Sequence, residues 1–428
     1  MIRVGALRAL AGVLLLAGST SGLADPPQRL GVASCAQSFC HGSARPLAAT
    51  RVLQNEYMTW LSFDPHSRAY ATLRSAKSQA MTARLGLGAA TESKVCLDCH
   101  TDYVPRTQRG PKFQLDDGIG CEACHGSASS WIAPHHSGAD RSHAANVARG
   151  LVALDQPRAR AAVCTGCHVG DRSRFASHAL MAAGHPRLSF ELDTFTEIWR
   201  TSGGREHYRR DADYAQAAKS TTTGGRVWLR GLIEAATARL DLIDAQGGKQ
   251  GLMPEFGVYN CYSCHRQMRV AAWAAAPSDG LAPGSLRFDD SAVRMLIAAF
   301  EGARRPIADE LRRATREWQQ SLNDAGRLKT AQQNLRRVLA AANGELDRLQ
   351  FAPALSRAML DALVAAARRG EFPDYASAEQ AAMAMVLLLA DSGGELKRRP
   401  DIDRLFQALR DDSQFDPRIF RERIAELK

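Results

Sequence analysis

Four copies of one short motif, Cys-x-x-Cys-His, carry most of the chemistry that this sequence offers. Two thiols separated by two residues can form thioethers with the two vinyl groups of one porphyrin, and the histidine that follows can bind the iron as an axial ligand. A chain with 10 cysteines and 12 histidines would rarely contain even one copy by chance. The copies are Cys96, Cys99 and His100; Cys121, Cys124 and His125; Cys164, Cys167 and His168; and Cys261, Cys264 and His265.

Two other chemistries also use pairs of cysteines separated by two residues. Zinc knuckles bind a metal ion through such pairs, and thioredoxin-like sites use them for redox exchange. Zinc has no need for a histidine directly after every second cysteine, and a redox site has no need for four copies. We therefore interpret the four motifs as attachment sites for c-type haem.

The remaining cysteines, Cys35 and Cys40, precede His41 in a longer motif with four intervening residues. The longer loop can bulge outward while both sulfur atoms still reach the vinyl groups. The alternative is a disulfide between the two cysteines, which an exported protein can form, although so small a ring would be strained. The haem interpretation predicts five covalently attached c-type haems. The proximal ligands would be His41, His100, His125, His168 and His265.

Seven further histidines lie in the same part of the chain, and none follows residue 265. Binding every iron by two histidines would take five of them as distal ligands. Beside its neighbouring arginines, His207 is interpreted as a solvent-exposed residue, and His136 ranks lower still. The distal candidates are His66, His135, His143, His178 and His185.

Local sequence supports two of these candidates, His66 and His135. His66 follows Pro65 and opens a segment with helical apolar spacing, which predicts that it lies in the first turn of a helix. His135 and His136 are neighbours, so a regular backbone points them apart and only one is expected to bind iron. Because Pro134 bends the chain just before them, we favour His135.

His178 and His185 are seven positions apart, but Gly184 and Pro186 interrupt any helix between them. The residue before a proline is biased toward an extended conformation, which predicts a fixed, rigid turn at His185. For His143 the local sequence gives no preference.

The N-terminus has the features of an export signal. Arg3 and Arg8 form a basic region, the apolar run 9–17 follows, and residues 22–24 offer a small-x-small cleavage site before Asp25. The alternative is a retained anchor, but the run is shorter than the about 20 residues that span a membrane. We expect a signal peptide over 1–24 and a mature periplasmic protein without an integral membrane segment.

The net charge of +10 falls to +8 when Arg3 and Arg8 are removed with the signal. A basic chain invites nucleic acid as a partner, but export argues against nucleic acid. Ten ionised propionates on five haems would bring the charge to about −2. The basic excess is therefore weak support for any outside partner.

The chain of 428 residues is long enough for two or three domains. We expect a haem domain over 25–275, a linker rich in proline and glycine over 276–290, and a helical hairpin region over 291–428. Helical apolar spacing recurs over 227–243, 335–349 and 355–364. Ser377 with Gln380 suggests a capping box that opens an apolar helix through Leu389, and Gly393 would stop it. The predicted fold class is mainly α with little sheet.

Several segments resemble the cytochrome c-554 family of multihaem cytochromes. They are the glycine-flanked motif of His125, the early motif of His41, the His-Ser-Arg-Ala-Tyr segment at His66 and the Ala-Gly-His-Pro segment at His185. The resemblance covers roughly residues 31–270. It implies an exported electron carrier linked to the oxidation of nitrogen compounds, with a mainly helical fold and haems packed in stacked and near-perpendicular pairs. It also implies proximal roles for the five motif histidines and distal roles for His66 and His185.

The chain also departs from related proteins. The best-known member of the family has four haems, whereas this chain has five motifs. Pentahaem nitrite reductase and hydroxylamine oxidoreductase share the haem packing, but the former commonly replaces one motif histidine by lysine, and no residue here matches the crosslinking tyrosine of the latter. These departures argue against both reactions.

Three functions follow from these patterns. The first is electron transfer between a redox donor and a redox acceptor through closely packed haems, with no catalytic residue identified. The second is a haem-based oxidoreductase acting on a small nitrogen or sulfur compound at one iron with an open position. The third is a scaffold or redox sensor that docks through its C-terminal helices, whose arginine-rich faces we otherwise interpret as solvated surface.

Overall fold

The computed structural model describes residues 26–45, 53–194, 224–247, 254–265, 280–281, 285–394 and 400–427. The predicted signal peptide and His207 lie outside these residues. Within them the chain is helical, and extended pairing is limited to two isolated bridges, Arg29 with Arg109 and Tyr259 with Phe288. The predicted mainly α fold is confirmed.

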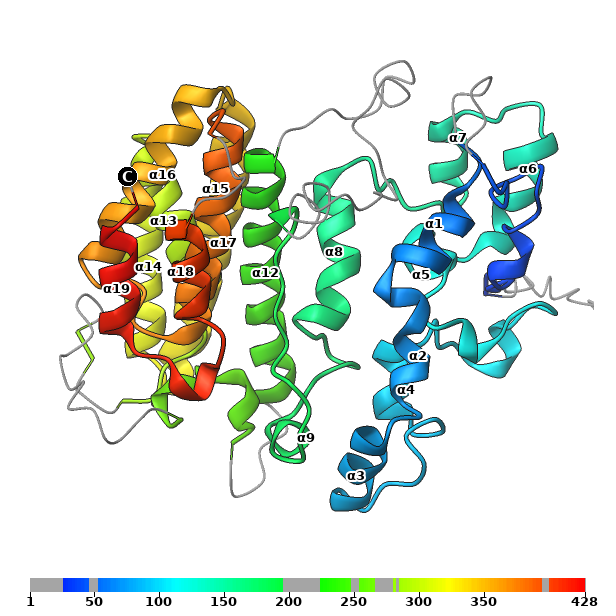
Figure 1. Ribbon diagram of the computed structural model, residues 1–428, viewed down its shortest axis with the longest axis horizontal. Helices are drawn as coiled ribbons and strands as arrows, with labels where there is room; N and C mark the ends of the chain where they lie inside the picture. Colours follow the sequence, from blue (N-terminus) through cyan, green and yellow to red (C-terminus); the bar gives the residue numbers. More distant parts are fainter. Residues whose placement is uncertain are drawn as a thin grey trace, which may run out of the picture.

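The helices of the N-terminal half are short and joined by long irregular segments (Figure 1). Serine side chains cap α3, α7 and α9, and proline begins α8 at a position where its missing N–H costs nothing. Apolar clusters here are small, such as that of Leu73, Ala90 and Leu97. The helices are α1 (Glu56–Phe63), α2 (Ala69–Thr72), α3 (Ala76–Arg84), α4 (Lys94–His100), α5 (Cys121–His125), α6 (Ile132–Ser137), α7 (His143–Ala148), α8 (Pro157–His168) and α9 (His178–Ala182).

The C-terminal half is a bundle of longer helices around one apolar core (Figure 1). Trp228, Phe300, Trp318, Leu335 and Leu388 are fully buried in that core. The helices are α12 (Gly224–Gly247), α13 (Ser291–Gly302), α14 (Ile307–Gln320), α15 (Ala325–Arg348), α16 (Pro353–Arg368), α17 (Tyr375–Asp391), α18 (Pro400–Gln407) and α19 (Pro417–Ala425). The helical spacing over 227–243, 335–349 and 355–364 is confirmed by α12, α15 and α16.

Helix α12 connects the two halves. Its buried side chains belong to the core of the bundle, although the sequence placed these residues in the haem domain. On another face α12 packs along α8, the helix that ends in the motif of His168 (Figure 1). One haem motif is therefore built directly against the C-terminal bundle.

The predicted capping box of α17 is wrong by three residues. The helix begins at Tyr375, and the Asp374 side chain accepts the amide of Ser377 at 2.9 Å. Ser377 is inside the first turn, where its hydroxyl donates back to the carbonyl of Asp374. Aspartate caps a helix as well as serine does, so the sequence held two competing caps.

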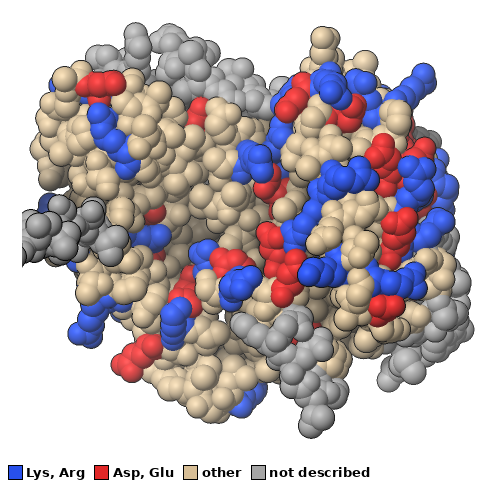
Figure 2. Space-filling model, turned by 180° about the vertical axis from the view of Figure 1, so that it is seen from behind, with Lys and Arg blue, Asp and Glu red and all other residues tan. Residues whose placement is uncertain are grey.

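Charged side chains are dense over the bundle, as the face in Figure 2 shows, and the two signs are interspersed. Arg336 pairs with Asp241 and Asp244, and Arg230 pairs with Asp347. Such pairing fits the interpretation of the arginine-rich faces as solvated surface. Within the described parts of the chain, no helix is both long and apolar enough to cross a membrane.

Candidate haem-binding sites

Three of the four short motifs lie on α-helical turns. In α4, α5 and α8 the two cysteines and the histidine stand at positions i, i+3 and i+4, which share one face of a helix. The remaining short motif, which ends in His265, begins with the 3-10 turn Cys261–Ser263. In the long motif, Cys35 ends the 3-10 turn Val32–Ser34 and Cys40 lies in the turn that follows. Each motif thus presents its sulfur atoms and its histidine together.

A buried carboxylate holds the motif of His125 in place. Glu122, 2% exposed, lies between the two cysteines of α5 and accepts the backbone amides of Leu30, Gly31 and Ala128. This ties the N-terminal segment to the motif helix. Gly126 follows with a φ of +83°, and a Cβ there would lie 2.6 Å from the carbonyl oxygen of Gly150. Glu122 and Gly126 therefore have structural roles that are separate from haem attachment.

The ten cysteines form no disulfide, so the alternative bond between Cys35 and Cys40 is not present in the structure. Thiols from different motifs instead approach one another. Cys35 makes a hydrogen-bond contact with Cys121, and Cys99 makes one with Cys167. The attachment points of different motifs thus lie side by side.

The thiols differ in acidity. Burial raises the pKa of Cys124 to about 12 and that of Cys164 to about 11. A hydrogen bond from Cys99, helped by the nearby Arg174 guanidinium, lowers the pKa of Cys167 to about 7. The guanidinium Nη1 of Arg174 lies 3.6 Å from the sulfur of Cys167.

Among the described residues, four of the motif histidines are seen to face a histidine from elsewhere in the chain. A metal–imidazole nitrogen bond is about 2 Å long and each nitrogen lies about 1 Å from its ring centroid, so two rings on opposite sides of one iron have centroids about 6 Å apart. The observed centroid distances fit this spacing. They are 6.2 Å for His41 and His135, 6.1 Å for His66 and His168, 6.3 Å for His100 and His185, and 6.1 Å for His178 and His265.

The hydrogen bonds of the rings point the same way. In each of five paired histidines the Nδ1 atom faces an oxygen, which leaves Nε2 for the metal. Three of the acceptors, Glu56, Asp64 and Ser189, were not singled out from sequence; the two-residue separation of Asp64 and His66 is the one local signal among them. The pairs are His41 with Glu56 at 3.0 Å, His66 with Asp64 at 2.8 Å, His100 with the Ala69 carbonyl at 3.0 Å, His168 with the Ser189 carbonyl at 3.3 Å and His185 with the Pro186 carbonyl at 2.7 Å.

These hydrogen bonds and burial also set the acidity of the rings. The hydrogen bond that His66 donates to the Asp64 carboxylate raises the pKa of His66 above its usual value. Burial lowers the pKa values of His135, His168 and His185, and so favours their neutral, metal-binding form.

His143 is arranged differently from these histidines. Its Nε2 atom, not its Nδ1 atom, lies 3.0 Å from Asp155. The side chain is more than half exposed. The fifth motif histidine, His125, ends α5, and its carbonyl oxygen accepts the amide of Val152 at 3.0 Å.

Two local expectations differ from the structure. His66 lies in a 3-10 turn, Pro65–Arg68, that leads into α2, with Asp64 capping the turn. Pro134 lies within α6 and not in a bend before His135, and from this helix the His135 ring contacts Trp131 and His41. Adjacent positions on a helix point about 100° apart, which separates His135 from His136.

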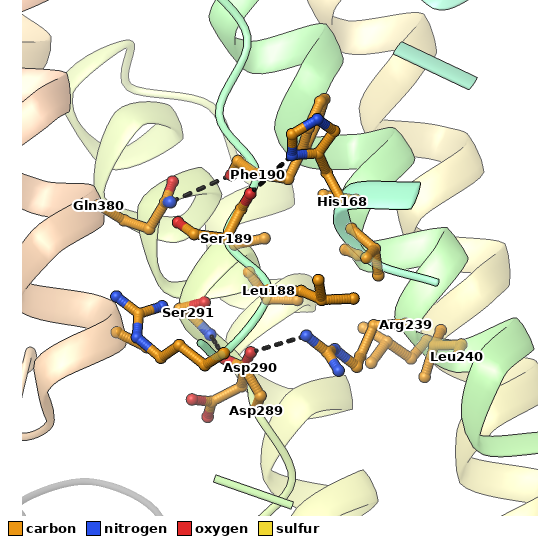
Figure 3. A pocket seen from close by; sticks show the side chains of 18 of the residues that line it. His168, Leu188, Ser189, Phe190, Arg239, Leu240, Asp289, Asp290, Ser291 and Gln380 are labelled. Carbon is orange, nitrogen blue, oxygen red and sulfur yellow. Dashed lines mark hydrogen bonds and ion pairs between the residues drawn. The ribbon is translucent and has the colours of Figure 1, made fainter. Parts of the chain in front are cut away.

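One short segment serves three sites. His178 begins α9 and faces His265, His185 follows it and faces His100, and the carbonyl oxygen of Ser189 faces Nδ1 of His168 (Figure 3). Twelve consecutive residues, 178–189, therefore contribute to three sites. Among the described residues, no three side chains of His, Cys, Asp or Glu come together as a site for a bare metal ion.

Residues 34–126 match the sequence model of the family described as cytochrome c554 and c-prime. This stretch contains the motifs that end in His41, His100 and His125, and over it the resemblance to multihaem c-type cytochromes of the c554 family is confirmed. The match supports a c-type cytochrome with covalently bound haem that acts in electron transfer. No curated protein and no solved structure matches the chain.

Proposed function

Starting from the likeness of residues 34–126 to the cytochrome c554 family, we propose that this chain is an exported pentahaem c-type cytochrome. It carries electrons between redox partner proteins through closely packed haems, most of them bound by two histidines. The five motif histidines are the proximal ligands. The distal ligands are His135 opposite His41, His185 opposite His100, His66 opposite His168 and His178 opposite His265.

The spacing of the four histidine pairs carries this proposal. In every pair one ring comes from a haem motif and the other from a distant segment, at the separation expected for two axial ligands of one iron. Chance contacts between histidines would not pair a motif histidine with a histidine outside the motifs each time. A bound c-type haem supplies one-electron exchange at iron without any change in covalent structure.

The side chains of the protein limit the chemistry at iron to electron exchange. Two strong nitrogen ligands hold an iron in place in both oxidation states and leave no position for a substrate. The oxygen acceptors at Nδ1 fix each ring in one tautomer and orientation. These are the properties of an electron carrier.

The contacts between thiols support a continuous route. Cys35 touches Cys121, and Cys99 touches Cys167. Helices α5 and α8, which carry the motifs of His125 and His168, are also in contact. These contacts link the motifs of His41, His125, His168 and His100 in that order. The segment 178–189 then leads on to the site of His265.

Haem content and electron paramagnetic resonance of the same oxidised sample test the proposal. Five haems per chain, measured by mass and by haem absorbance, with all low-spin signals would support an electron carrier. A stoichiometric high-spin signal that shifts on addition of nitrite, hydroxylamine or cyanide would favour the alternative, an oxidoreductase with one open iron. A haem content below five would contradict the pentahaem assignment.

Export and docking are tested separately. An N-terminal sequence that begins at Asp25 in periplasmic extracts would support the signal peptide, and a retained Met1 would contradict it. Docking of redox partners through the C-terminal helices predicts that a pull-down with the full chain loses its partners when an exposed apolar residue of α19, Ile419, is replaced by aspartate. Unchanged partners would contradict docking at that helix.

A further inference from the structure

We propose that Glu379 and Gln380, two neighbouring residues of helix α17 in the C-terminal bundle, are positioning residues for the haem ligand His168. They act through the extended segment 187–190, which supplies the acceptor for Nδ1 of that histidine. The inference rests on the proposed function, because it takes His168 as an axial ligand.

Three hydrogen bonds connect the bundle to the ligand, and Figure 3 draws those of His168 and Gln380. The Ser189 carbonyl faces His168 Nδ1 at 3.3 Å, and the Ser189 hydroxyl donates to Glu379 Oε2 at 3.1 Å. One residue further, the Gln380 side-chain amide donates to the carbonyl oxygen of Phe190 at 3.1 Å. The peptide that orients the ring is therefore held from the bundle side at two consecutive residues.

A partly buried ion pair makes the same link stronger. Arg187 donates to Glu379 Oε2 at 2.5 Å and lies over the ring of Tyr375, 4.7 Å from its centroid. Burial lowers the pKa of Arg187, but the Glu379 carboxylate outweighs burial and raises it overall. Tyr375 donates in turn to the Leu409 carbonyl oxygen at 2.8 Å. The anchor thus extends from the segment into the bundle.

His168 has a backbone carbonyl as its Nδ1 acceptor, as His100 and His185 do, whereas other ligands have carboxylates. For His41 and His66 the Nδ1 acceptors are Glu56 and Asp64, which lie next to or near their own ligand sites in the N-terminal half. For His168 the acceptor is a backbone carbonyl in an extended segment. The position of such a carbonyl oxygen depends on the groups that hold its backbone segment.

A small cavity lies beside the contact between Ser189 and His168. It has a volume of about 50 Å³, and its lining includes His168, Ser189, Gln380, Arg239 and Asp289 (Figure 3). That is more than a water molecule needs. If the bundle released the segment, water would compete for Nδ1 of His168.

The expected consequence is electrochemical. A hydrogen bond from Nδ1 to a carbonyl oxygen makes the imidazole a more basic ligand, which stabilises the oxidised iron and lowers the midpoint potential. Weakening that bond raises the potential of this one haem. Glu379→Gln also leaves the Arg187 charge uncompensated near the site, and that acts in the same direction.

The experiment uses the full haem-loaded chain and two variants, Gln380→Leu and Glu379→Gln. The readouts are the midpoint potentials from a spectroelectrochemical titration and the low-spin electron paramagnetic resonance signals. His66→Gly identifies the relevant haem as the one whose low-spin signal is lost. Both variants are expected to raise the potential of that haem and shift its signal, while the other haems keep theirs.

Matched controls exclude a general effect of altering the bundle. Gln332→Leu removes another buried glutamine, and Asp347→Asn breaks the exposed ion pair with Arg230; both residues lie on α15 and not on α17. If Gln380→Leu and Glu379→Gln give the same potentials and signals as these controls, the positioning role is overturned. If His66→Gly removes no low-spin signal, the ligand assignment of the proposed function fails instead.

Discussion

The imidazole rings of His41 and His135 are nearly parallel, with an angle of 16° between their planes. The rings of His66 and His168 are instead perpendicular, at 86°, and those of His100 and His185 are at 90°. The backbone of each segment and the oxygen at Nδ1 set these orientations. The proposed ligand pairs are therefore of at least two geometric kinds.

We expect the two kinds to be visible in the electron paramagnetic resonance of the oxidised protein. Parallel rings split the two iron d orbitals that overlap with the ligands, whereas perpendicular rings leave these orbitals nearly degenerate. The site of His41 should give an ordinary rhombic low-spin signal, and the two perpendicular sites should give signals of much larger anisotropy. A spectrum that contains one kind of low-spin signal alone would contradict the ring orientations.

The neighbours His135 and His136 offer a test of the ligand assignment with a built-in control. Replacing His135 by alanine should convert one haem from low-spin to high-spin and remove the rhombic signal. Replacing His136 by alanine should change neither, because the ring that stacks on His41 is that of His135, and adjacent positions on a helix point about 100° apart. Carbon monoxide binding to the reduced protein should follow the same pattern. A high-spin haem in the His136 variant would reverse the assignment.

Sequence alone predicts the proximal ligands, because the motif fixes their position. It also favours His135 over His136, and the structure places the His135 ring beside His41, although Pro134 lies within a helix and not in a bend before it. The partner of each motif histidine was beyond local patterns: His66 faces a histidine about one hundred residues away. Such pairing depends on how segments pack in space.

The same limit applies to the groups that support the ligands. Helical periodicity predicted α12 but not that it would share its core with the C-terminal helices, because apolar spacing shows which face is buried and not against what. Nothing local indicated that Ser189 would supply the acceptor for His168. A capping rule pointed to Ser377 although Asp374, three residues earlier, holds the helix end.

The carboxylate at His41 should set the potential of its haem. In the structure Glu56 accepts from Nδ1 of His41, which gives the ring partial imidazolate character. Glu56→Gln should raise the midpoint potential of that haem by on the order of 59 mV, a tenfold change for one electron. Asp155→Asn, which alters the contact of His143, is the control and should leave the potentials unchanged. A lower potential in the Glu56 variant would contradict this role.

The cap of α17 makes a prediction about stability. Asp374→Ala should lower the free energy of unfolding by about 1–2 kcal/mol, because the amide of Ser377 loses its acceptor in a buried place. Asp374→Asn should retain most of the stability, since asparagine caps equally well. Thermal unfolding followed by circular dichroism compares the variants. An alanine variant as stable as the asparagine variant would show that the cap contributes nothing.

The ion pair between Asp289 and Arg239 links the segment before α13 to α12, at 3.1 Å (Figure 3). Burial alone would raise the pKa of Asp289, but Arg239, the amide of Ser291 and Arg187 outweigh it and hold the pKa below its usual value. Asp374 and Cys261 are the other titratable groups nearby, and their anionic forms would oppose this effect. The folded protein thus favours the ionised form of Asp289.

A group whose pKa is lowered by folding stabilises the protein above its unfolded pKa, about 3.9 for aspartate. That stabilisation is lost as the pH falls through the folded pKa. Asp289→Asn should therefore lower the free energy of unfolding by about 1.5–3 kcal/mol near neutral pH. The difference from the parent protein should shrink below about pH 4. Thermal unfolding between pH 3 and 7 measures it, with the exposed Asp347→Asn as a control that should cost at most about 1 kcal/mol. A difference that persists or grows in acid would mean that Asp289 is not held ionised by its arginines.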